Sequence, residues 1–171
     1  MWRRSFSKLP LRASVLGFLT RSFSREAGKR FAALWGNGDY GRLGLGNLDS
    51  QWKPVVCPAF RNQTLNAIAC GGAHTLFLTD DGCVYATGLN DFGQLGVSES
   101  KHYSVEPGKI YLTAFSVFGI SQDPLLVFGE EKKVVQISAG YSHSCAITVD
   151  GELYMWGKNT SGQLGLGKRN N

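Results

Sequence analysis

Two histidines are the first candidates for chemistry in this 171-residue chain, since an imidazole serves as a general base or as a metal ligand. His74 lies in the stretch 71–75, Gly-Gly-Ala-His-Thr, and His143 lies in 140–144, Gly-Tyr-Ser-His-Ser. The two histidines are 69 residues apart and share their setting. A catalytic base is rarely needed twice in the same setting, so the recurrence favours a structural role for both, such as a side-chain bond to a turn.

The other reactive residues form no recognisable site. The cysteines include no C-x-x-C pair and His102 has no companion at ligand spacing, so we predict no metal site. Gly36, Gly38 and Gly41 match a dinucleotide-binding loop, but no helix follows them. The sequence therefore predicts no catalytic residue, no cofactor and no small-molecule substrate. The four cysteines are Cys57, Cys70, Cys83 and Cys145.

A glycine-rich stretch recurs three times, at residues 35–46, 87–97 and 156–167, and we call these copies the glycine loops. In each loop a glycine follows the first residue, a second comes five later and a third comes three after that. Self-similarity at a long period predicts a repeat architecture. The glycines are Gly36, Gly41 and Gly44, then Gly88, Gly93 and Gly96, then Gly157, Gly162 and Gly165.

A second block precedes two of the glycine loops, at 69–86 and at 138–155. We expect residues 75–79 to form a strand that is buried on both faces, followed by an Asp-Asp-Gly hairpin and a return strand over 83–86. Further strands are expected around 54–56 and over 65–70. The residues that recur 69 positions apart are Gly71 and Gly140, His74 and His143, and Gly82 and Gly151.

Four short antiparallel strands per repeat are typical of a β-propeller blade. The glycine loop, the Gly-x2-His turn, the Asp-Gly hairpin and the Trp-Gly strand end resemble the regulator of chromosome condensation repeat family over about residues 31–167. The resemblance implies an all-β fold, a partial propeller with about two four-stranded blades of an expected seven. We expect a fragment or splice form of a longer protein, and pairing with other copies is the alternative.

The spacing between repeats predicts an insertion. Gly44 and Gly71 are 27 residues apart, whereas Gly96 and Gly140 are 44 apart. Removing residues 108–124 restores the shorter spacing and makes the region read like 52–56. Retained intron sequence and a binding loop both remain open as its origin. Residues 168–171 form a tail.

The net charge of +5 is concentrated at the N-terminus. Residues 1–30 hold eight of the eighteen Lys and Arg residues and one acid, whereas 31–171 hold ten basic and twelve acidic residues, net −2. The pI is therefore no evidence for a basic binding face on the propeller. No apolar run is long enough to span a membrane.

The first 23 residues are rich in Arg and Ser and poor in acid, which predicts a mitochondrial transit peptide. We expect cleavage between Phe23 and Ser24, a linker over 24–30 and a mature protein in the matrix. A plastid leader and a basic tail for nucleic acid are the alternatives. The matrix is reducing, so disulfides are not expected.

The family includes a nuclear exchange factor for a small GTPase, a plant ultraviolet photoreceptor and organelle proteins in RNA processing or ribosome assembly. The chain most resembles a plant mitochondrial member, which implies a non-enzymatic scaffold in transcript splicing or organelle gene expression that supports respiratory complex I assembly. Protein partners are implied, organelle RNA-processing factors among them. A guanine-nucleotide exchange factor and a non-functional truncated isoform are the alternatives. Light sensing is disfavoured, because no tryptophan lies beside His74 or His143.

Overall fold

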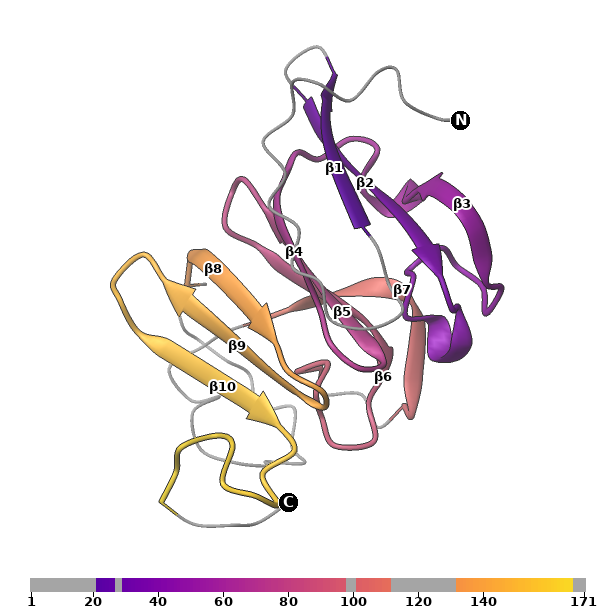
Figure 1. The fold of residues 1–171 in the computed structure, drawn as a ribbon. Helices are drawn as coiled ribbons and strands as arrows, with labels where there is room; N and C mark the ends of the chain where they lie inside the picture. Colours follow the sequence, from indigo (N-terminus) through magenta and orange to yellow (C-terminus); the bar gives the residue numbers. More distant parts are fainter. Residues whose placement is uncertain (1–20, 27–28, 98–100, 112–131, 168–171) are drawn as a thin grey trace, which may run out of the picture.

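The computed structural model describes residues 21–26, 29–97, 101–111 and 132–167, which form three antiparallel sheets with two short 3-10 turns (Figure 1). We call these sheets the first, second and third blades. The first holds β1 (Arg21–Glu26), β2 (Lys29–Gly36) and β3 (Gln51–Val56). The second holds β4 (Leu65–Cys70), β5 (His74–Thr79), β6 (Val84–Leu89) and β7 (Tyr103–Ile110). The third holds β8 (Val134–Ala139), β9 (His143–Thr148) and β10 (Leu153–Gly157).

Within each blade, each strand pairs with the next one along the chain, and the blades pack against one another. The 3-10 turn η1 (Asp39–Gly41) contacts β6 and β7, while β4 and β5 contact β8. The second 3-10 turn is η2 (Pro58–Phe60). Figure 1 shows the three sheets side by side in chain order, with the second blade between the first and the third. This arrangement confirms the all-β, partial β-propeller prediction, with one four-stranded blade between two that have three described strands each.

The middle strand β5 explains how the blades stay together. All six of its residues are buried, as the sequence predicts for 75–79, because β5 lies within its own sheet and between two neighbouring blades. Alternate side chains of a strand point to opposite faces. Leu76 and Leu78 therefore join a core with the third blade, while Phe77 joins a core with the first.

Two apolar cores result, one at each blade junction. Between the first and second blades, Phe77 packs against Phe60 of η2 with ring centroids 4.8 Å apart, and Leu34 and Leu43 complete the cluster. Between the second and third blades, Leu76 and Leu78 share a core with Ile137 of β8, among others. Burial of this apolar surface stabilises each junction by roughly 25 cal/mol per Å² removed from water.

The start of the first blade differs from the sequence-based expectation. The resemblance to the repeat family begins at about residue 31, but β1 pairs antiparallel with β2 and extends the sheet back to residue 21. The segment 24–30, expected as a linker, contributes the end of β1 and the start of β2. In the register, Phe23 faces Ala32 and Ser24 faces Phe31, so the bond expected to be cleaved lies within β1. Residues 1–20 of the expected leader lie outside the described residues.

The fourth strand of the second blade lies earlier in the chain than the repeat alignment suggests. Gly108 faces Ala86 and Lys109 faces Tyr85, as Val55 and Val56 face the equivalent residues of β2. Ile110 then fills the buried position of Cys57. The strand therefore continues past residue 108, where the sequence places the start of the insertion. Local repeat spacing cannot distinguish two apolar segments competing for one strand position. Residues 112–131 lie outside the described part.

Candidate functional site

The recurring histidine of the second blade joins that blade to the third. His74 is fully buried, and its Nε2 lies 2.9 Å from Ser144 Oγ on β9. Ser144 Oγ donates its one proton to the carbonyl of Gln94, at 2.8 Å. Because that hydroxyl proton is already used, the geometry assigns the donor role in the first contact to His74 Nε2–H. Trp156 Nε1 donates to the same Gln94 carbonyl at 2.9 Å, so both of its lone pairs are occupied.

The junction between the first and second blades repeats this design. Thr75 Oγ1 donates to the carbonyl of Arg42 at 2.6 Å, and these residues occupy the repeat positions of Ser144 and Gln94. Thr87 Oγ1 donates to the carbonyl of Gly41 at 2.9 Å. The first glycine loop therefore offers backbone carbonyls to hydroxyl donors on the second blade, and the second loop offers one to a hydroxyl and an indole donor on the third blade. Such bonds fix the orientation of one blade on another, and each contributes on the order of 1 kcal/mol.

The glycines beside the histidines leave room for the imidazole. A Cβ on Gly71 would lie 2.2 Å from His74 Cε1, and a Cβ on Gly140 would lie 2.1 Å from His143 Cε1. Of the two histidines, only His74 contacts a following blade in the described structure, and His143 is half-buried. The structure thus uses these residues in packing and in hydrogen bonds between blades.

The glycine loops supply the tight backbone that the junctions need. Gly88 shows why, since its φ is +110° and an added Cβ would lie 2.3 Å from the carbonyl oxygen of Ala73. Of the predicted repeat glycines, Gly71 and Gly140 alone lack a positive φ. The others with positive φ are Gly36, Gly41, Gly44, Gly82, Gly93, Gly96, Gly151, Gly157, Gly162 and Gly165.

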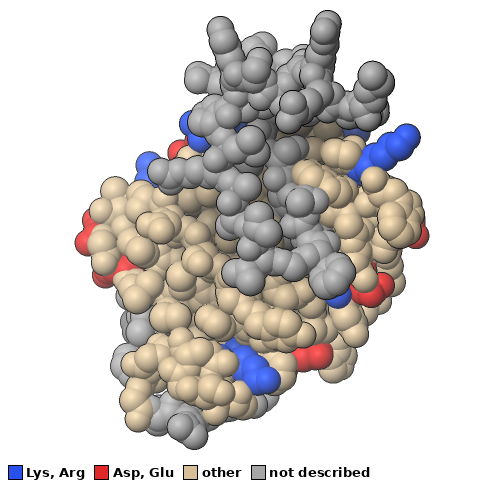
Figure 2. Space-filling model, viewed as in Figure 1, with Lys and Arg blue, Asp and Glu red and all other residues tan. Residues whose placement is uncertain are grey.

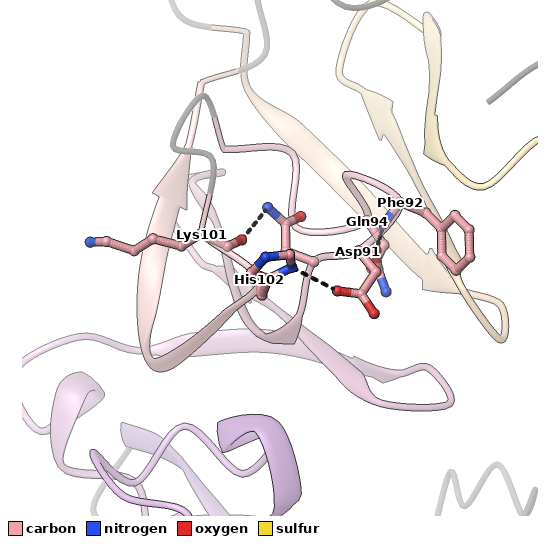
Figure 3. A network of polar contacts seen from close by, with 6 residues as sticks. Asp91, Phe92, Gln94, Lys101 and His102 are labelled. Carbon is pink, nitrogen blue, oxygen red and sulfur yellow. Dashed lines mark hydrogen bonds and ion pairs between the residues drawn. The ribbon is translucent and has the colours of Figure 1, made fainter.

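The second glycine loop is tied together by its own polar side chains (Figure 3). Asn90 accepts a bond from the Leu95 N–H at 3.1 Å and donates to the Lys101 carbonyl at 3.2 Å. His102 Nδ1 lies 3.3 Å from Asp91 Oδ1, and both side chains are exposed. These contacts join the loop to the segment that leads into β7. They satisfy the hydrogen-bonding groups of the blade itself and do not bring together a nucleophile, a base and a group that orients the base.

Two of the cysteines, Cys57 and Cys145, lie in surroundings that disfavour the reactive thiolate. Cys57 is buried and its thiol donates to the Gly44 carbonyl at 3.3 Å, and burial raises its pKa to about 11. Burial also raises the pKa of the Cys145 thiol. A thiol becomes a nucleophile or a metal ligand as the thiolate, which these environments disfavour. Among the described residues, no three His, Cys, Asp or Glu side chains are grouped so that they could hold a metal ion.

The charged surface offers no concentrated basic area on the face that Figure 2 shows. Lys and Arg side chains stand apart there, separated by uncharged or acidic residues. This matches the net charge of −2 that residues 31–171 carry. In the part of the chain that the structure describes, no helix is sufficiently long and apolar to cross a bilayer.

One surface pocket was missed by the sequence reasoning. It has a volume of about 300 Å³ and is lined by Asp39 and Tyr40 of η1, Leu48 and Tyr103 of β7, so it bridges the first and second blades. Tyr40 occupies a loop position that holds Phe92 in the second copy and Ser161 in the third. This change of residue at one position of an otherwise regular loop is the sequence feature that could have indicated the pocket.

Comparisons with known proteins agree with this architecture. A model of the regulator of chromosome condensation (RCC1) repeat matches residues 34–78 and 81–147, and a second model of this repeat matches 66–94 and 134–163. The mitochondrial RCC1 domain-containing protein RUG3 of Arabidopsis thaliana is 35% identical over 150 residues, which cover 88% of this chain and 29% of RUG3. The X-linked retinitis pigmentosa GTPase regulator of Canis lupus familiaris is 36% identical over 163 residues, 94% of this chain and 15% of that protein.

Among solved structures, Prp20p from Saccharomyces cerevisiae matches with a TM-score of 0.66 and 23% identity, covering 85% of this chain and 33% of Prp20p. That likeness supports the fold alone. The chain thus spans no more than a third of any of these three proteins. Because RCC1-repeat matches extend over most of 34–163 and the sheets stack as propeller blades, the chain belongs to the regulator of chromosome condensation (RCC1) repeat family.

Proposed function

We propose that this chain is a non-enzymatic propeller scaffold that binds proteins in mitochondrial RNA processing, in particular transcript splicing, or in organelle gene expression. In this role it supports assembly of respiratory complex I. The proposal includes a transit peptide over 1–23, cleaved between Phe23 and Ser24, and a matrix location for the mature chain. Propeller blades extend from the β1–β2 hairpin to residue 167, with an insertion after β7 in the connection between the second and third blades.

The use of the recurring polar residues supports a scaffold. His74, Ser144 and Thr75 hold blades together, so His74, one of the two histidines that first suggested chemistry, takes part in the packing of the blades. The blades present aromatic side chains to solvent, among them Tyr40 of η1 and Tyr103 of β7. Exposed aromatic residues are typical of protein-binding surfaces. Fold alone does not specify function, so this inference rests on the surface and not on the propeller.

The leader and one relative support the organelle. Residues 1–30 carry eight basic residues and one acid, and the relative RUG3 is a mitochondrial protein by its name. Import can be tested with isolated mitochondria and the full 171-residue chain. We expect a shortened, protease-protected product that begins at Ser24, and a variant with Arg3, Arg4 and Arg12 changed to Glu should stay outside. A product of full length that remains protease-sensitive would contradict the location.

The RNA-processing role needs its own experiment. Affinity purification of the imported chain from mitochondria should recover splicing or ribosome-assembly proteins, and its depletion should leave unspliced organelle transcripts and less complex I. A matched purification from organelles that carry an unrelated imported propeller identifies background proteins. Normal splicing and normal complex I after depletion would remove this role and leave the scaffold without an assigned process.

Guanine-nucleotide exchange is the second candidate function. Its support is that one relative is named a GTPase regulator. Exchange activity would appear as faster release of a fluorescent guanine nucleotide from a small GTPase. For the scaffold we expect no acceleration at any concentration of the chain. A rate that rises with concentration would favour the exchange factor instead.

A further inference from the structure

The pocket between the first and second blades has the chemistry of a cation site. Tyr40 and Tyr103 supply two aromatic rings, each close to half exposed, and Leu48 adds an apolar wall. Asp39 contributes a carboxylate, and no basic side chain lines the pocket. Aromatic faces attract cations through their quadrupole, and a carboxylate adds Coulomb attraction and a hydrogen-bond acceptor. The matching ligand is a cation with an apolar stem.

The carboxylate is held in place by its neighbours. Asn37 Nδ2 donates to Asp39 Oδ2 at 2.9 Å, and the Asp39 N–H donates to Asn37 Oδ1 at 2.7 Å. Among the described residues no hydrogen bond reaches Asp39 Oδ1, so this oxygen can accept from a ligand. The nearest cation of the same loop, Arg42, has its guanidinium 5.7 Å from the Tyr40 ring centroid. Its N–H groups donate to the carbonyls of Asp39 and Gly72, which fixes it beside the ring.

In the second glycine loop, a lysine contacts the aromatic residue that corresponds to Tyr40. Phe92 stands at the repeat position of Tyr40, and Lys158 Nζ of the third blade lies 4.6 Å from the Phe92 ring centroid. The residue of the second blade that corresponds to Lys158 is Leu89, which carries no charge. The first loop therefore has the aromatic residue and the carboxylate but lacks the lysine of the next blade.

The backbone at Tyr40 gives a further reason to look at this residue. Its φ is +60°, and within the described residues no other non-glycine residue has a positive φ. For an ordinary side chain this conformation costs about 1 kcal/mol. Glycine would adopt it without strain, so the aromatic ring is kept at a cost in stability. Strained residues of this kind gather at binding sites.

We propose that this pocket binds the side chain of a lysine or arginine presented by a protein partner. The inference rests on the proposed function as a protein-binding scaffold and deepens it by naming the chemistry of the contact. The aliphatic stem lies against Leu48 and the tyrosine rings, and the charged head reaches Asp39.

The test uses the full chain and short peptides followed by amide chemical shifts. Ac-Gly-Gly-Lys-Gly-Gly-NH₂ and its arginine analogue should shift the signals of Tyr40, Leu48 and Tyr103. Peptides with N-acetyl-lysine or citrulline, which keep the stem and lose the charge, should bind at least about fivefold more weakly, because 1.4 kcal/mol is tenfold and about 1 kcal/mol is expected for a cation–π contact. Equal affinity for the charged and neutral peptides would overturn the proposal.

Variants separate the two parts of the pocket. Asp39→Asn and Tyr103→Leu should each weaken the lysine peptide about fivefold, whereas Tyr103→Phe keeps the ring and should leave binding unchanged. Asp91→Asn, at the same repeat position in the second loop, is the matched control and should also bind normally. Undiminished binding by Asp39→Asn, or shifts confined to another surface, would overturn the proposal. Peptide binding with failed import would instead contradict the mitochondrial role, so the two failures are distinguishable.

Discussion

His74 of the second blade and Ser144 of the third are joined by a buried hydrogen bond, with Nε2 and Oγ 2.9 Å apart. The Ser144 hydroxyl in turn donates a hydrogen bond to the Gln94 carbonyl. The two blades therefore share a short chain of hydrogen bonds between residues that are fully buried. Within a low-dielectric junction, a polar chain of this kind stabilises one arrangement of the blades only while each member is present.

Loss of this bond should weaken the junction. We expect His74→Ala to lower the free energy of unfolding by about 3 kcal/mol, since it removes a buried ring and leaves Ser144 with fewer partners. Ser144→Ala should cost about 1 to 2 kcal/mol, and the double variant should reveal a coupling of about 1 kcal/mol. Urea unfolding followed by tryptophan fluorescence measures all three.

The matched control is the histidine of the third blade. His143 is half-buried and makes no side-chain bond to another blade in the described structure, so His143→Ala should cost only about 1 kcal/mol. Equal losses for the two histidines would show that packing on the preceding glycine, which both share, matters more than the bond between blades.

Two glycines of the same repeat should respond differently to alanine. At Gly88 an added Cβ meets the Ala73 carbonyl at 2.3 Å and φ is +110°, so Gly88→Ala should cost more than about 3 kcal/mol or prevent folding. At Gly93 φ is +74° but no atom lies within 4 Å, so Gly93→Ala should cost about 1 to 2 kcal/mol from backbone strain alone. Thermal unfolding of both variants shows which one is less stable. The close approach of the backbone predicts that Gly88→Ala loses more stability, whereas positive φ alone predicts similar losses for both.

Cys57 should resist alkylation in the folded chain. Burial raises the pKa of its thiol to about 11, so at pH 8 only about one molecule in a thousand carries the reactive thiolate. Treatment with iodoacetamide followed by peptide mass analysis should leave Cys57 unmodified, whereas the same treatment in urea should modify it fully. Rapid modification under native conditions would mean that the first junction opens readily.

The hairpin carboxylate Asp81 should make stability depend on acid. The Thr79 hydroxyl donates to Asp81 Oδ1, and this bond is the main reason that the pKa of Asp81 is lowered in the folded chain. A lowered folded pKa contributes stability above the unfolded value, about 3.9, and this contribution is lost as pH falls through the folded value. Asp81→Asn should therefore be less stable than the parent at pH 7, and the difference should shrink as the pH falls through the folded pKa of Asp81.

Asp80→Asn is the control for this titration. Asp80 is the adjacent turn residue and is exposed, and its side chain makes no hydrogen bond in the described structure. The Asp80→Asn variant should have the stability of the parent chain at pH 7, because no side-chain hydrogen bond is lost. A difference for Asp81→Asn that persists at pH 2 would point to loss of hairpin geometry and not to loss of a charge.

Much of the fold follows from local sequence. The continuous apolar or β-branched run over 75–79 and the Asp-Gly turn at Gly82 are short-range signals, and they predict β5 and its hairpin correctly. The strand over 65–70 and that around 54–56 are also found, as β4 and β3. The strands of the third blade follow from the repeat, since the pattern of one blade predicts the strands of the next.

Other features depend on contacts between distant residues. The pairing of β1 with β2 and the use of Ile110 as the last residue of β7 are choices between competing strand partners. The pocket needs Tyr40 and Tyr103, which come from different blades and are brought together only by the way the blades stack. The spacing of residues along one strand does not predict that these two side chains lie close together.

For this protein, sequence alone determined the repeat and most of the short strands, because these follow from glycine geometry and from patterns within about twenty residues. Tertiary structure alone decided that His74 bonds to Ser144, that Gln94 offers its carbonyl to two donors, and that a carboxylate and two tyrosines form one pocket. These relationships arise at junctions between blades, where the packing of one sheet on the next sets which side chains meet.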